Sequence, residues 1–82
     1  MQNEETQQNI HIGNLIRNEL ERQGRKISWF AKQINCDRSN AYKILKRDNV
    51  DIKLLIQISE ALNHNFFEDC SRLVCIKNEG LQ

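Results

Sequence analysis

One stretch decides the fold of this chain, and it reads Phe30-Ala31-Lys32-Gln33-Ile34-Asn35-Cys36-Asp37-Arg38-Ser39-Asn40-Ala41-Tyr42-Lys43-Ile44. Apolar residues recur at helical spacing on both sides of a short polar segment that leaves room only for a tight turn. Asn35 tolerates the positive φ that ends a helix, and Asp37 can accept hydrogen bonds from the first N–H groups of the next one. Ala31 is small enough to let two helices cross closely. The stretch therefore predicts a helix-turn-helix, with helices over about 27–34 and 38–47.

Three further helices are expected around this pair. The apolar spacing predicts a helix over about 11–23 and another over about 52–62, the second opening at Asp51 as its N-cap. The helix over 52–62 is apolar on most sides, so we expect it to be the central buried helix. A last helix should begin at Phe66 and end near Cys75.

The composition fits one all-α domain, a five-helix bundle over residues 10–75. The chain has 82 residues, no proline and only three glycines, and proline is the residue that most often ends helices. We expect a flexible arm over 1–9 and a C-terminal tail over 76–82. No signal peptide and no apolar run of the roughly 18 residues that span a bilayer is visible, so a cytoplasmic protein with reduced cysteines and no membrane partner is expected.

The charge is unevenly distributed along the chain. The total is +1, but residues 25–53 hold eight basic and three acidic residues, a net of +5. Residues 1–24 and 54–82 are each at −2. A basic centre between acidic flanks indicates an anionic partner for one face, although a merely solvated charged surface is the alternative.

The predicted helix over 38–47 has one polar face. Ala41, Ile44 and Leu45 define its inward side at about 100° per residue. The remaining side chains carry no carboxylate: Arg38, Ser39, Asn40, Tyr42, Lys43, Lys46 and Arg47. Arginine can bind guanine O6 and N7 in a bidentate way, and asparagine can do the same for adenine N6 and N7. This face suits the major groove of DNA.

Other functional patterns are weak. His11 and His64 with Cys70 and Cys75 make a poor zinc pattern, and nothing resembles a catalytic set or a phosphate loop, so we expect no enzyme, no metal and no cofactor. Packing is the favoured role of Trp29, with a DNA or protein contact as the alternative. Phe66 and Phe67 are expected in the core and in the docking of the last helix.

The stretch from Phe30 to Ile44 resembles the helix-turn-helix of the Cro/phage-repressor (Xre-type) regulators, and the resemblance extends over about residues 12–68. Phe30-Ala31 stands where the family commonly has Leu-Ala, Asn35 where it favours glycine, and Asp37 where it has a capping Ser or Thr. A compact bacterial subgroup with Trp-Phe-Ala in the first helix of the pair is also similar.

The resemblance implies a DNA-binding site. The positions that contact bases in the family fall on Arg38, Ser39 and Lys43, with Asn40 beside them. The positions that contact phosphates fall on Arg25, Lys26, Lys46 and Arg47, and we add Tyr42. The chain departs from the family at two places. Leu20 and Leu45 occupy positions where many relatives have an Arg and a Glu that pair, so an apolar contact is expected instead of an ion pair. Arg47 stands where the family has a glycine, in the loop after the helix over 38–47.

The sequence thus predicts a bacterial or phage-type transcriptional regulator that reads double-stranded DNA with the helix over 38–47. Such domains usually bind as dimers, and we expect a homodimer surface at Phe67, Cys70, Leu73 and Val74. The rival hypothesis is a protein-interaction module, antitoxin-like or an adaptor, that keeps the fold without reading DNA.

Overall fold

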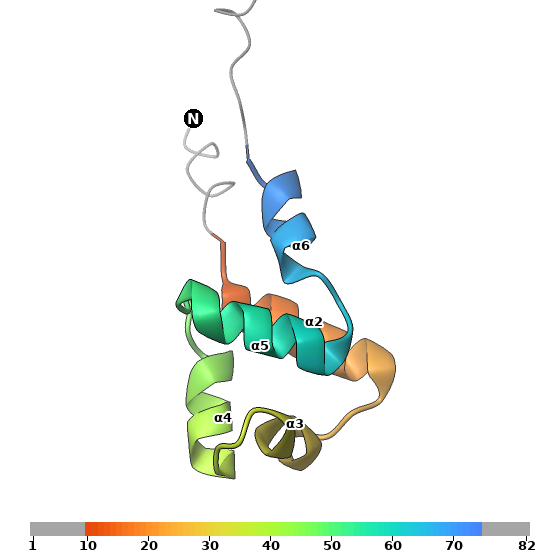
Figure 1. The fold of residues 1–82 in the computed structure, drawn as a ribbon, viewed down its shortest axis with the longest axis vertical. Helices are drawn as coiled ribbons and strands as arrows, with labels where there is room; N and C mark the ends of the chain where they lie inside the picture. The colour runs from red at the N-terminus through yellow and green to blue at the C-terminus, as the bar shows by residue number, and fades with distance from the viewer. Residues whose placement is uncertain (1–9, 75–82) are drawn as a thin grey trace, which may run out of the picture.

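A computed structural model describes residues 10–74, and these residues form five helices without a strand. The helices are α2 (Ile12–Gln23), α3 (Ile27–Gln33), α4 (Arg38–Leu45), α5 (Ile52–Leu62) and α6 (Phe66–Arg72) (Figure 1). The prediction of an all-α five-helix bundle is confirmed.

Side chains cap four of the helices. His11, Asp37, Asp51 and Asn65 each accept a hydrogen bond from a backbone N–H two or three residues further along, at 2.7–3.1 Å. These bonds satisfy donors that the first turn of a helix leaves without a partner. A residue with a left-handed backbone conformation follows each of α2, α3 and α5, namely Gly24 (φ 70°), Asn35 (φ 57°) and Asn63 (φ 53°). Local chemistry therefore sets most of the helix boundaries.

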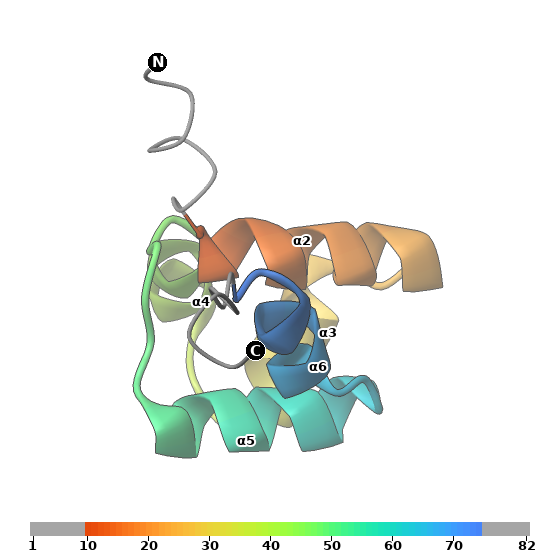
Figure 2. The same cartoon turned by 90° about the horizontal axis from the view of Figure 1, so that it is seen from above.

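The five helices form a bundle that has α6 at one end and α3 with α4 at the other (Figure 1). α2 and α5 run in the same direction on opposite sides of the molecule, and α6 lies between them when the molecule is seen from above (Figures 1 and 2). α3 and α4 lie at the opposite end, and both limits of the described chain lie on the α6 side (Figure 1).

Each helix contributes one side chain that is fully shielded from solvent. Ile16, Phe30, Ala41, Ile58 and Phe66 all have 0% exposure, and they come from α2, α3, α4, α5 and α6 in turn. Burial of a large apolar side chain stabilises a fold by about 1.5–3 kcal/mol. All five helices, α6 included, therefore depend on the same core.

Three expectations need correction. α5 is not buried on most sides, because Ile52 and Ile56 are 62% and 44% exposed and only one side of the helix faces the bundle. α4 ends at Leu45 rather than at residue 47, since the N–H groups of Lys46 and Arg47 bond three residues back and tighten the chain into a turn. α6 ends at Arg72; Cys75 lies outside the described residues, as do the expected arm and tail.

Candidate functional site

A tight turn places α4 against α3. The N–H of Cys36 donates to the carbonyl of Ala31 at 3.0 Å, across Asn35 in its left-handed conformation. Ala31 is buried, and its small side chain lets the two helices approach. The turn that the sequence predicted is therefore present, and it fixes the start of α4.

The end of α4 is held by the start of α2. The N–H groups of Ile12 and Gly13 donate to the carbonyls of Asp48 and Arg47, at 3.1 and 2.8 Å. The backbones meet so closely that a Cβ on Gly13 would lie 2.2 Å from the carbonyl oxygen of Leu45. Sequence reasoning had no signal for this contact, because the two segments lie more than thirty residues apart.

The outward face of α4 is polar and free of carboxylates, as the sequence predicted. Ala41, Ile44 and Leu45 are buried, while five side chains lie exposed: Arg38, Ser39, Asn40, Tyr42 and Lys43. Leu20 and Leu45 are each only 1% exposed, so the core accommodates two leucines where the family resemblance would place an ion pair.

The structure gathers several of the predicted residues into a hollow between α2, α3 and α4. Its basic lining residues are Arg17, Arg25, Lys26 and Arg38, and Tyr42 is beside them. We call this the basic hollow. Arg17 comes from α2 and was not among the predicted site residues, because nothing in the linear sequence relates it to α4.

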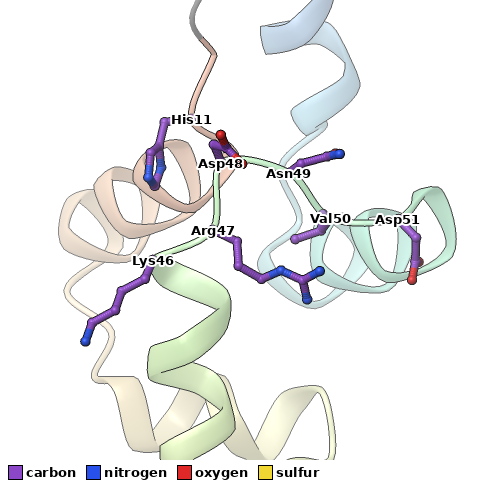
Figure 3. Close-up of a pocket in the computed structure, with 7 residues that line it drawn as sticks. All are labelled: His11, Lys46, Arg47, Asp48, Asn49, Val50 and Asp51. Atoms are coloured by element: carbon purple, nitrogen blue, oxygen red, sulfur yellow. The ribbon is translucent and has the colours of Figure 1, made fainter.

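Lys46 and Arg47 lie apart from the basic hollow. They line a second depression with His11 and the residues up to Asp51, and their side chains diverge on either side of the chain (Figure 3). Asp48 and Asp51 also line this depression, so it carries both signs of charge. The end of α4 therefore lies next to His11, the N-cap of α2, as the seven residues drawn in Figure 3 show.

Arg25 is oriented by an aromatic ring. Its guanidinium lies over Trp29, 4.2 Å from the ring centroid, which is a cation–π contact. Trp29 itself is half-buried and packs against the core. The favoured packing role of Trp29 is therefore supported, and the ring additionally carries Arg25.

The predicted dimer residues lie at the α6 end. Leu73 and Val74 are exposed, and Phe67 and Cys70 line an apolar hollow with Ile10, Ile52 and others. Phe66 is fully buried as expected, whereas Phe67 is only partly covered. Burial, and secondarily the neighbouring aspartate, raises the pKa of the Cys36 and Cys70 thiols, which keeps both protonated and poorly reactive.

A buried carboxylate escaped the sequence reasoning. Glu19 is 6% exposed and is held by Arg22, by Gln23 Nε2 at 2.7 Å and by His64 Nδ1 at 3.6 Å. The hydrogen bond from Arg22 is the main cause that lowers the pKa of Glu19 to about 2. His64 meets Asp69 through its other ring nitrogen at 2.8 Å. Within residues 10–74, no three His, Cys, Asp or Glu side chains are arranged to hold a metal ion.

Comparison with known proteins adds no relative. No family model, no curated protein and no solved structure matches the chain. Among the described helices, none has the length and apolar character needed to cross a membrane.

Proposed function

We propose that this protein is a sequence-specific DNA-binding regulator of the Xre type, which places α4 in the major groove of double-stranded DNA. Arg38, Ser39, Asn40 and Lys43 would contact base edges. Arg25, Lys26, Tyr42, Lys46 and Arg47 would contact phosphates on either side of the groove.

The observation that carries the proposal is the outward face of α4. It is exposed, carries cations, amides and hydroxyls, and has no carboxylate from Arg38 to Arg47. The helix of eight residues is also held at both ends, by the turn after α3 and by the backbone of Ile12 and Gly13. A polar helix kept rigid in this way can present its donors to DNA at little entropic cost.

Selection from random duplexes tests the proposal. We expect one preferred sequence, and a logarithm of the binding constant that falls with the logarithm of salt concentration with a slope near −4 to −5 if about five phosphates are contacted. A chain that retains its fold and selects no duplex would contradict DNA binding and favour the rival protein-interaction module.

A matched pair of lysine variants separates base reading from phosphate binding. Lys43→Ala should lose discrimination at one base position, because this residue lies in the middle of the exposed face of α4. Lys46→Ala should weaken binding to all duplexes alike and reduce the salt slope by about 1. Equal behaviour of both variants and wild type on the selected duplex would show that a different face binds.

We also propose that the protein binds DNA as a homodimer joined at the α6 end. Leu73 and Val74 are exposed directly after α6, the helix from which Phe67 and Cys70 line the apolar hollow, and apolar side chains exposed on the surface mark candidate interfaces. Sedimentation equilibrium should show a dimer for wild type and a monomer for Leu73→Glu/Val74→Glu with unchanged helix content. A monomeric wild type at concentrations that saturate DNA would contradict the dimer.

A further inference from the structure

We propose that the basic hollow between α2, α3 and α4 binds a phosphate of the DNA backbone, and that Arg17 of α2 is one of its contact residues. The inference rests on the proposed DNA binding. It adds a binding residue that lies outside the helix-turn-helix, on a helix with no other proposed DNA contact.

The first observation is an excess of cations over carboxylates in the hollow. Three separate segments bring Arg17, Arg25, Lys26 and Arg38 to one hollow, whose lining contains a single carboxylate, Glu21. Within residues 10–74, none of the four cations lies within 4 Å of a carboxylate oxygen. Like charges gathered in this way repel each other, and an anion in the hollow would offset that repulsion.

The second observation is the chemistry of the lining. Tyr42 and Ser28 supply hydroxyl groups to this lining. Phosphate oxygens accept from guanidinium and hydroxyl donors, and the planar guanidinium can hold two of them at once.

The third observation is that one of these cations is already oriented. The guanidinium of Arg25 stacks on Trp29 at 4.2 Å from the ring centroid, so part of its side-chain entropy is lost before any ligand arrives. Trp29 lines a neighbouring depression that shares Arg25, Lys26 and Ser28 with the basic hollow, so this oriented donor lies at the border between the two.

The basic hollow lies near the start of α4, so a phosphate bound there would help to position this helix in the major groove. Arg38 is the first residue of α4 and Tyr42 lies about one turn further along, whereas Lys46 and Arg47 follow the last residue of the helix. An eight-residue helix is about 12 Å long, close to the width of the major groove. Contacts at both ends of α4 can therefore reach the two backbones that border the groove, and they would set the register of the helix along the bases.

The test compares two glutamine variants of the full chain on the duplex that wild type selects. Arg17→Gln should reduce affinity for all duplexes alike, leave the base preference unchanged and make the salt slope shallower by about 0.9. Arg17→Lys should restore the slope. Arg72→Gln is the control, because it removes the same charge from α6 at the opposite end of the molecule (Figure 1).

The outcomes separate the two proposals. Equal salt slopes for Arg17→Gln, Arg72→Gln and wild type would overturn the phosphate site while leaving DNA binding intact. A wild-type chain that binds no duplex would overturn both. Thermal unfolding and sedimentation of each variant identify a loss of fold or of dimer, and an Arg17→Gln effect that Arg17→Lys does not reverse would count against the site.

Discussion

Gly13 illustrates how one residue positions the candidate site. Two constraints meet there: its N–H donates to the carbonyl of Arg47, and its missing side chain leaves room for the carbonyls of Leu45 and Arg47. The loop after α4 rests directly on the first turn of α2. A residue with no functional group thus determines where Lys46 and Arg47 lie.

We expect Gly13→Ala to destabilise the protein by about 1–3 kcal/mol, although alanine favours helices, because the added methyl group would displace backbone atoms. Urea unfolding followed by circular dichroism measures this. Asn14→Ala is the control at the next position of α2, where the side chain is exposed and the change should stay within about 0.5 kcal/mol. A Gly13→Ala variant as stable as wild type would show that the two segments separate easily.

At the scale of elements, Glu19 connects α2 to the chain around α6. Its carboxylate binds Arg22 and Gln23 on its own helix, and Gln23 Nε2 also donates to the carbonyl of Leu62 at 2.8 Å. His64 then links Glu19 to Asp69 on α6. Polar side chains therefore fasten α2, the end of α5 and α6 together beside the apolar core.

This network predicts a defined pH dependence. Because the pKa of Glu19 falls from 4.5 to about 2 on folding, its stabilisation is complete above pH 4.5 and is lost as the pH falls toward 2. The free energy of unfolding should therefore decrease over this window in wild type and decrease less in Glu19→Gln. Glu60→Gln, which changes an exposed carboxyl on α5, serves as the control.

A Glu19→Gln protein that loses stability with acid as steeply as wild type would show that other carboxylates govern the transition. If Glu60→Gln loses stability with acid as wild type does, the reduced pH dependence of Glu19→Gln is specific to Glu19.

At the scale of the molecule, the two ends have different surfaces. The α3–α4 end carries the basic hollow and the polar face of α4, and the α6 end carries Leu73, Val74 and the apolar hollow. The shared core connects them, since Phe66 of α6 is as deeply buried as Phe30 of α3. A contact between two copies at the α6 end would leave the α3–α4 end uncovered, as the proposed DNA binding requires.

We expect α6 to be an integral part of the fold. Phe66→Ala should cost about 3–5 kcal/mol, because it removes a fully buried ring. Phe67→Ala, at a partly covered position of the same helix, should cost clearly less. Urea unfolding of both variants makes the comparison, and equal costs would contradict the assignment of Phe66 to the common core.

The helices could be predicted because their signals are local. Asp37, Asp51, Asn65 and the left-handed Asn35 act within a few residues of themselves, and the apolar spacing defines the inward faces. The burial of α5 was misjudged for the same reason: seven of its eleven residues are apolar, and only the arrangement of the other helices shows that Ile52 and Ile56 stay exposed.

By itself, the sequence determined the five helices, the caps at Asp37, Asp51 and Asn65, the turn at Asn35 and the carboxylate-free face of α4, because each depends on neighbours in the chain. Tertiary structure alone decided the rest: Gly13 beneath the loop after α4, Glu19 against His64, and Arg17 beside Arg25 and Arg38. These groupings join residues from different helices. Their distances follow from how the shared core packs, which no local pattern of residues encodes.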